Sequence, residues 1–282
     1  MNYEDDHRSI KYFVKRFFLL NGERFRDRKV VDFPAGNGIT SRILSEIGAK
    51  PLAFDLFPEY FKVPGMTCTR ANISTGIPLP DSFSDALICQ EGLEHFSDQL
   101  SALKEFNRVL KPSGTLIITT PNYSNLRAKL SYLLSESERF NSLMPPNEID
   151  SIWMSDQDIT PDIYYGHLFL TGILKLRVLA RLAGFKIKKI HPTRMKSTSM
   201  LLFPFLYPFI VCSNGIAYRN NIRKGKDQDI LLRKQTYREI FKIAVNPRIL
   251  VDSHLMVEFE KETEVSGVAK RLKGLHRVFG TT

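Results

Sequence analysis

The sequence contains few cysteines, and their spacing does not suit metal binding. Its 282 residues include three of them, Cys68, Cys89 and Cys212, and no two form a C-x-x-C pair. Neither a disulfide framework nor a zinc site is therefore expected, and a reducing compartment suits the chain. Residues 1–10 (MNYEDDHRSI) are polar and acidic, so we expect no signal peptide and a cytoplasmic protein.

Long hydrophobic runs are absent as well. The most apolar stretch, residues 200–212 (MLLFPFLYPFIVC), has thirteen residues, whereas a helix needs about twenty to cross a bilayer. The uncharged segment 197–218 is longer but contains Pro204 and Pro208, so we do not expect a spanning helix there. The segment is preceded by a basic region, because residues 175–200 hold eight Lys or Arg and no Asp or Glu.

Two interpretations of the segment 197–218 stay open. An apolar wedge between cations is what an interfacial segment needs for peripheral contact with an anionic membrane. The same segment could instead cover a pocket or form a dimer contact, burying Phe203, Phe205, Tyr207 and Phe209. The net charge of +10 is compatible with an anionic partner, although surplus lysines often serve only solubility.

Short apolar strands alternate with helical patterns along most of the chain. We predict strands at 29–33, 51–55, 66–71, 85–89, 115–119, 185–190 and 254–261, and helices at 39–47, 99–110 and 168–183. This order is typical of a doubly wound α/β fold with a mostly parallel seven-stranded sheet. The alternating pattern of the last strand suits a sheet edge.

The expected organisation divides the chain into four units. They are an amphipathic N-terminal helix (1–24), a Rossmann-like core (25–192) with a substrate lid (120–166), an apolar and basic insertion (193–250), and the last strand with the C-terminal tail (251–282). The insertion thus lies before the last strand of the sheet.

The first predicted strand runs into a tight turn that contains glycine, VVDFPAGNGITSRIL (residues 30–44). In an open parallel sheet a ligand binds at this place, where small residues let it approach the backbone. No lysine follows the glycines, which excludes a P-loop. The dinucleotide fingerprint G-x-G-x-x-G is incomplete, because Ser41 stands at its third glycine.

The same turn fits the pattern D-x-G-x-G-x-G better, with Asp32, Gly36 and Gly38 in place and Pro34 at the first glycine. This pattern resembles motif I of the class I S-adenosylmethionine-dependent methyltransferases. Asp55 ends the second predicted strand, where an acidic side chain can accept hydrogen bonds from both ribose hydroxyls.

Further segments resemble the same family. They are residues 70–98, with QEGLEH at 90–95, then NRVLKPSGTLIITTPN at 107–122 and GHLFLTGILKLRVLARLAGF at 166–185. The resemblance implies S-adenosyl-L-methionine as the cofactor. It also implies a set of cofactor-binding residues: Asp32, Pro34, Gly36, Gly38, Asp55, Leu56, Asn72, Ile73, Gln90 and Glu91. Asn72 stands where the family usually has an aspartate facing the adenine amino group.

Each of these side chains also has a purely structural interpretation. Asp32 could cap the amides of the turn, and Asp55 could be a solvated strand end. Asn72 could be an ordinary turn residue. Glu91 and Glu94 precede a helical pattern, where acidic side chains interact favourably with the helix dipole.

The family's reaction moves a methyl group from a sulfonium to a lone pair on O, N, S or C, and alignment in a dry pocket supplies most of the catalysis. A hydroxyl acceptor would gain from a positioned base, for which His95 and His167 are candidates. Tyr164 and Tyr165 could line the substrate pocket. The five acids of residues 148–162 could bind a cationic substrate or a metal, but they suit a solvated loop better, so no metal is expected.

The resemblance implies a methyltransferase, and we expect O-methylation of a small or lipid-linked acceptor of the surface-glycan type at the cytoplasmic membrane face. The loop QEGLEH replaces the N/D-P-P-Y/F motif of nucleobase methylases, which makes a nucleic-acid acceptor unlikely. An NAD-dependent oxidoreductase and a non-catalytic nucleotide- or nucleic-acid-binding module are the rival hypotheses. The sequence does not determine the oligomeric state.

Overall fold

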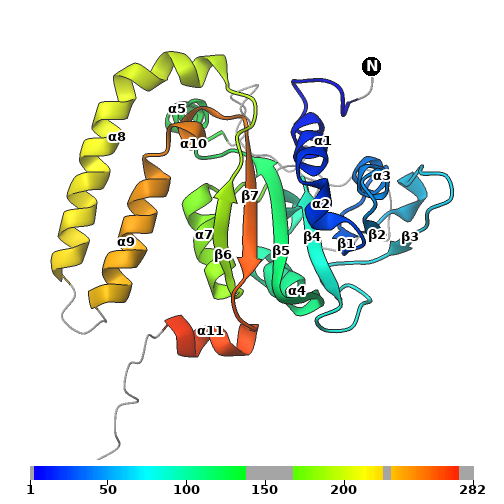
Figure 1. The fold of residues 1–282 in the computed structure, drawn as a ribbon. Helices are drawn as coiled ribbons and strands as arrows, with labels where there is room; N and C mark the ends of the chain where they lie inside the picture. The colour runs from blue at the N-terminus through cyan, green and yellow to red at the C-terminus, as the bar shows by residue number, and fades with distance from the viewer. Residues whose placement is uncertain (1–2, 138–167, 225–229, 273–282) are drawn as a thin grey trace, which may run out of the picture.

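The computed structural model of the chain describes residues 3–137, 168–224 and 230–272, which contain a seven-stranded sheet. Its strands are β1 (Lys29–Asp32), β2 (Lys50–Asp55), β3 (Cys68–Arg70), β4 (Ser84–Gln90), β5 (Leu110–Pro121), β6 (Phe185–Ile190) and β7 (His254–Lys261). They lie in the order β3-β2-β1-β4-β5-β7-β6. Among the strands that the structure describes, β7 alone runs antiparallel to its neighbours. The predicted mostly parallel α/β fold is confirmed (Figure 1).

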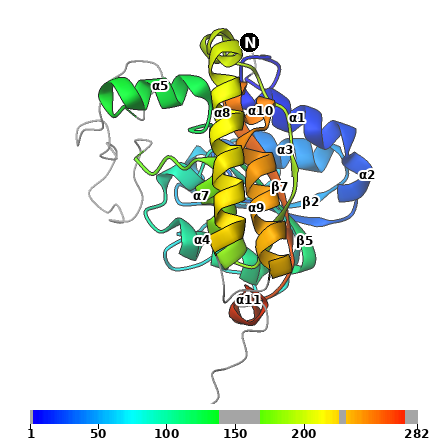
Figure 2. The ribbon, with the colours of Figure 1, turned by 90° about the vertical axis from the view of Figure 1, so that its left-hand side faces the viewer.

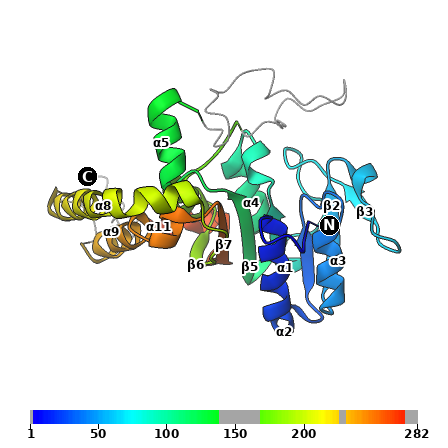
Figure 3. The ribbon, with the colours of Figure 1, turned by 90° about the horizontal axis from the view of Figure 1, so that it is seen from above.

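Helices cover both faces of the sheet, as the view from above shows (Figure 3). They are α1 (Ile10–Leu20), α2 (Gly22–Phe25), α3 (Ile39–Glu46), α4 (Gln99–Val109), α5 (Leu126–Ser135), α7 (Ile173–Leu182), α8 (Ser197–Lys224), α9 (Ile230–Ala244), α10 (Pro247–Val251) and α11 (Val265–Leu272), with short 3₁₀ helices at Pro58–Tyr60 and Leu93–His95. Consecutive strand residues point to opposite faces. Leu87 and Leu116 therefore join the core under α4 and α7, whereas Ile88 and Ile117 join the core under α1 and α3.

Helix α7 begins five residues later than the predicted start at Leu168, because the preceding residues are held by α4. The Gln99 side chain donates to the carbonyl oxygen of Phe169 at 2.7 Å and accepts from the Thr171 hydroxyl at 2.7 Å. The Ser124 hydroxyl then accepts the N–H of Ile173 at 2.9 Å, which satisfies a free amide of the first turn. The helical periodicity of the sequence did not reveal these long-range contacts.

Strand β7 has the predicted bounds, but its predicted place at a sheet edge is wrong. It pairs with β5 on one side and with β6 on the other, and β6 forms the edge. The polar residues that suggested an edge are satisfied inside the protein. The buried Glu258 carboxylate lies 2.5 Å from Arg24 Nη2 and 3.0 Å from His191 Nε2. The buried Lys261 ammonium donates to two backbone carbonyl oxygens near the junction of α4 and β5, both at 2.7 Å.

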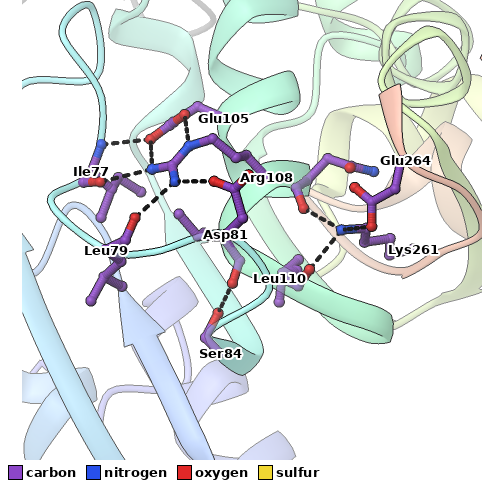
Figure 4. A network of polar contacts seen from close by, with 11 residues as sticks. Ile77, Leu79, Asp81, Ser84, Glu105, Arg108, Leu110, Lys261 and Glu264 are labelled. Carbon is purple, nitrogen blue, oxygen red and sulfur yellow. Dashed lines mark hydrogen bonds and ion pairs between the residues drawn. The ribbon is translucent and has the colours of Figure 1, made fainter. Parts of the chain in front are cut away.

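Arg108 of α4 fixes the loop that precedes β4 (Figure 4). Its guanidinium donates to the carbonyl oxygens of Ile77 at 2.9 Å and Leu79 at 2.8 Å. It also forms ion pairs with Glu105 and Asp81, both at 2.7 Å. The Arg108 side chain thus binds two backbone carbonyl oxygens and one carboxylate of the loop that leads into β4.

The apolar segment after β6 forms one long helix, and the expectation that it does not span a membrane stays a prediction. Helix α8 continues through Pro204 and Pro208, and by length and composition alone Ser197–Arg223 could cross a membrane. Each proline removes one backbone hydrogen bond, but α8 also packs against α5, α9 and α10. Figures 1 and 2 show α8 and α9 running side by side next to the β6 end of the sheet.

We expect Glu258→Gln to lower the free energy of unfolding at pH 7 by about 1–3 kcal/mol. Burial by itself raises the pKa of the Glu258 carboxyl, but hydrogen bonds from His191 and Arg24 outweigh it and lower that pKa to about 2. In the unfolded chain the pKa returns to its ordinary value of 4.5. The stabilisation by the ionised Glu258 carboxylate is therefore complete above pH 4.5 and is lost as the pH falls from there through about 2.

Urea unfolding of both proteins between pH 7 and pH 2 measures this difference. The two stability curves should converge toward acid pH, and a gap that stays constant would contradict the role of the carboxylate. Glu260→Gln is the matched control on the same strand, because the Glu260 ion pair with Lys186 at 2.8 Å is more exposed to solvent. It should cost less than Glu258→Gln.

Candidate active site

A cavity of about 680 Å³ lies beyond the carboxyl ends of β1, β2 and β4. This volume falls within the range of about 300–1,000 Å³ that is typical of small-molecule sites. Seven of the residues predicted for the cofactor or for catalysis line it: Pro34, Gly36, Asp55, Leu56, Gln90, Glu91 and His95. The ligand crevice of the predicted fold is therefore present in the structure.

The turn after β1 depends on two glycines. Gly36 and Gly38 have φ angles of 53° and 84°, in the left-handed region that glycine adopts without steric cost. A Cβ atom on Gly38 would lie 2.4 Å from the Val63 side chain, so the bare backbone allows the segment after β2 to close against this turn. Gly38 is the N-cap residue of helix α3 and does not line the cavity.

Asp55 connects the two loops that border the cavity. Its Oδ2 accepts the N–H of Gly36 at 2.7 Å, and its Oδ1 accepts the N–H of Phe57 at 2.8 Å. The residue is only 7% exposed yet lines the cavity. The carboxylate thus holds the glycine turn against the end of β2, and each oxygen keeps a lone pair for a further donor.

Asp32 is placed behind the cavity rather than in its lining. It is buried, and its Oδ2 accepts the hydroxyl of Ser41 at 2.6 Å. Burial raises the pKa of Asp32 to about 7, and the negative charge of Asp55 adds to the shift. Asp32 therefore fixes the first turn of α3, and its predicted contact with the cofactor stays a prediction.

Asn72 and Ile73 also lie outside the cavity lining, so their predicted contact with the cofactor stays a prediction. The Asn72 side chain accepts the N–H of Ser74 at 3.0 Å, which is an Asx-type turn contact. The Ile73 side chain is buried in the core beneath α4. Ala71, the residue before them, lines the cavity instead.

The end of β4 and the segment after it bring three predicted residues to the cavity. Gln90 accepts the Thr40 hydroxyl at 2.6 Å, which connects the end of β4 to the start of α3. Glu91 has a φ of 49°, a conformation that costs a non-glycine residue about 1–3 kcal/mol and is found preferentially at functional sites. His95 lies in the short helix that follows.

His254 is a residue of this site that the sequence reasoning did not identify. Its Nε2 lies 3.4 Å from Glu91 Oε2, and its Nδ1 lies 3.0 Å from the Ser253 hydroxyl. The Thr119 hydroxyl donates to Glu91 Oε1 at 2.9 Å. Residues from β5 and β7 thus orient one carboxylate of a residue that lines the cavity, although His254 lies 163 positions after Glu91 in the chain.

Glu94 differs sharply from Glu91 although both belong to the same loop. Its side chain is 1% exposed, and burial raises its pKa well above the ordinary value, with the charge of Glu91 adding to the effect. Burial and the neighbouring Glu91 carboxyl group thus favour the neutral form of Glu94. Sequence position alone does not distinguish them.

His167, Tyr164 and Tyr165 fall outside the described residues, so their predicted roles stay predictions. Several residues that do line the cavity were missed: Lys11, Phe33, Thr40, Phe57, Tyr60, Gly92 and Phe96. A Cβ atom on Gly92 would lie 2.4 Å from Pro34 Cδ, so these two loops meet at backbone distance. Within the described ranges no cluster of three or more His, Cys, Asp or Glu side chains could hold a metal ion.

Comparison with known proteins gives consistent results. Residues 31–118 match the methyltransferase domain family. Proteins named ubiquinone biosynthesis O-methyltransferase are similar in sequence: that of Xanthomonas campestris is 26% identical, with 50% of this chain and 66% of that protein covered. That of Methylococcus capsulatus is 34% identical, with 46% and 62% covered. The chain therefore matches less than two thirds of the length of these relatives.

A solved structure supports the fold. The SAM-dependent methyltransferase from Archaeoglobus fulgidus superimposes with a TM-score of 0.52 at 14% identity, with 92% of this chain and 98% of that chain covered. At this identity the likeness concerns the fold alone.

Proposed function

We propose that the protein is an S-adenosylmethionine-dependent methyltransferase that transfers a methyl group to a hydroxyl oxygen of its acceptor. The match of residues 31–118 to the methyltransferase domain family and the Rossmann-like fold support this proposal. The supporting observation is the cavity beyond β1, β2 and β4, with the Asp55 carboxylate at one loop and the Glu91 carboxylate at another. The O-methyltransferase names of the sequence relatives agree with an oxygen acceptor.

The residues around the cavity fit this cofactor. The buried Asp55 carboxylate can accept hydrogen bonds from ribose hydroxyls, and at Gly36 no atom lies within 4 Å of a Cβ position, so a ligand can approach the backbone. The rings of Phe57 and Tyr60 offer apolar surface to an adenine base, and the Lys11 ammonium suits an amino-acid carboxylate. S-adenosylmethionine supplies a methyl group that is activated by a sulfonium.

Glu91 is the candidate general base for a hydroxyl acceptor. Its carboxylate lines the cavity and would take the proton that the hydroxyl loses when its oxygen forms the new bond. His254 and Thr119 act as positioning residues, because they hold one carboxylate oxygen each. His95, which also lines the cavity, is the alternative base from the sequence prediction.

The proposed acceptor is a small or lipid-linked molecule of the surface-glycan type, methylated at the cytoplasmic face of a membrane. The exposed apolar side chains of α8, Phe205 and Phe209 among them, favour a location at a lipid surface. A nucleobase acceptor suits the site less well, because residues 90–95 lack the N/D-P-P-Y/F motif.

Asp55→Ala should weaken the binding of S-adenosylhomocysteine at least tenfold, because it removes the ribose acceptor and releases the amides of Gly36 and Phe57. Isothermal calorimetry on the full chain measures this, and NAD titrated in parallel should give no binding heat. Asp81→Ala is the control, since it changes an aspartate that is 79% exposed and lies outside the cavity lining. Equal affinities of wild type and Asp55→Ala would remove the ribose role.

Glu91→Gln should lower methyl transfer about a hundredfold or more and leave the affinity for S-adenosylhomocysteine nearly unchanged. Transfer is measured with radiolabelled S-adenosylmethionine and a bacterial lipid extract, with label counted in the organic phase. His254→Asn should give a smaller loss of methyl transfer and should change how the transfer rate depends on pH. The control His7→Asn, at an exposed histidine, should behave as wild type. Full activity of Glu91→Gln would assign the base elsewhere.

A further inference from the structure

Helix α8 presents a continuous apolar stripe to solvent. Leu201, Phe205, Phe209 and Ile216 are 70%, 68%, 73% and 54% exposed. With 3.6 residues per turn, these positions fall within an arc of about 80° on the helix surface. Exposed apolar surface of this extent marks an interaction site with a membrane or a protein. We call these four residues the α8 stripe.

The other side of α8 is attached to the body of the protein. Near its start, the buried Ser199 hydroxyl accepts the N–H of Arg127 at 3.1 Å, at the start of α5. Near its end, the Tyr218 ring lies 5.9 Å from the Phe241 ring of α9. Both ends of the helix are thus held, and Figure 2 shows α9 lying alongside the later part of α8.

Helix α9 is in turn fixed to the enzyme core. Glu239 of α9 accepts hydrogen bonds from Arg177 at 2.6 Å and from Arg181 at 3.3 Å, and both arginines belong to α7. Only residues 225–229 separate α8 from α9. A bilayer-crossing α8 would carry the start of α9 to the far side of the membrane and break these ion pairs. The structure therefore favours an α8 that stays beside the protein.

Basic residues flank the α8 stripe at both of its ends. Arg219 and Arg223 continue the same helical arc beyond Ile216, and both are exposed. Arg194 and Lys196 precede the first turn of α8, and residues 175–200 contain no acid. Cations at both ends of an apolar stripe match a surface of acyl chains and anionic headgroups. A partner protein would have to supply acidic groups at both ends of a flat apolar surface.

We propose that α8 lies in the plane of an anionic lipid bilayer, with the α8 stripe immersed at the boundary between headgroups and acyl chains and with arginines at the headgroups. The helix anchors the protein peripherally and does not span the membrane. This inference rests on α8 and α9 and is independent of the proposed methyl transfer.

Vesicle flotation of the full chain tests the lipid contact. Vesicles of phosphatidylcholine with about 30% of the anionic lipid phosphatidylglycerol should bind the wild type. Vesicles of pure phosphatidylcholine, which carry no net charge, should bind it several-fold less. The double variant Phe205→Ser/Phe209→Ser should lose at least five-sixths of the bound fraction, about a sixfold effect. Arg219→Gln/Arg223→Gln should reduce binding to the anionic vesicles specifically.

The matched control is Leu19→Ser/Leu20→Ser, because these residues of α1 are 56% and 73% exposed and lie away from α8. It should float like wild type. Circular dichroism verifies that each variant is folded. Equal flotation of Phe205→Ser/Phe209→Ser and wild type would overturn the proposal. The proposal would also be overturned if light scattering showed that the wild type is a dimer without vesicles and that Phe205→Ser/Phe209→Ser is a monomer.

Alkaline carbonate washing separates the two membrane orientations. A helix in the plane of the interface is released into the supernatant at high pH, whereas a spanning helix stays in the pellet. We expect release of the wild type. Retention in the pellet would show that α8 spans the membrane and would overturn the in-plane arrangement.

Discussion

The Asp55 carboxylate is the interaction on which the shape of the candidate site depends. It accepts the N–H of Gly36 from the turn after β1 and the N–H of Phe57 from the segment after β2. The loops that follow β1 and β2 are thereby fixed relative to each other. A ligand between them meets bare peptide on one side and a carboxylate on the other, a combination that suits a nucleoside with ribose hydroxyls.

Much of the fold follows from local patterns in the sequence. Gly184 ends α7, and the strand after it has the predicted bounds Phe185–Ile190. The positions of Asp55 and Gly36 at the cavity were also predictable, because the carboxyl ends of parallel strands meet at one edge. Glycine in a sharp turn and an acid at a strand end carry this information within a few residues.

The remaining features depend on residues that are distant in the sequence. Glu258 makes β7 look like an edge strand, but Arg24 and His191 neutralise it inside the sheet. His254 reaches Glu91 only because β7 inserts next to β5, which no local pattern of either segment indicates. The helix through Pro204 was missed for a similar reason, since its support comes from packing against α5, α9 and α10.

The most direct measurement is a crystal structure of the full chain with S-adenosylhomocysteine. Our account predicts the nucleoside in the cavity beyond β1, β2 and β4, with both ribose hydroxyls about 3 Å or less from the Asp55 carboxylate and the homocysteine sulfur directed toward the loop of Glu91. A nucleoside bound elsewhere, or one whose ribose does not reach Asp55, would contradict it.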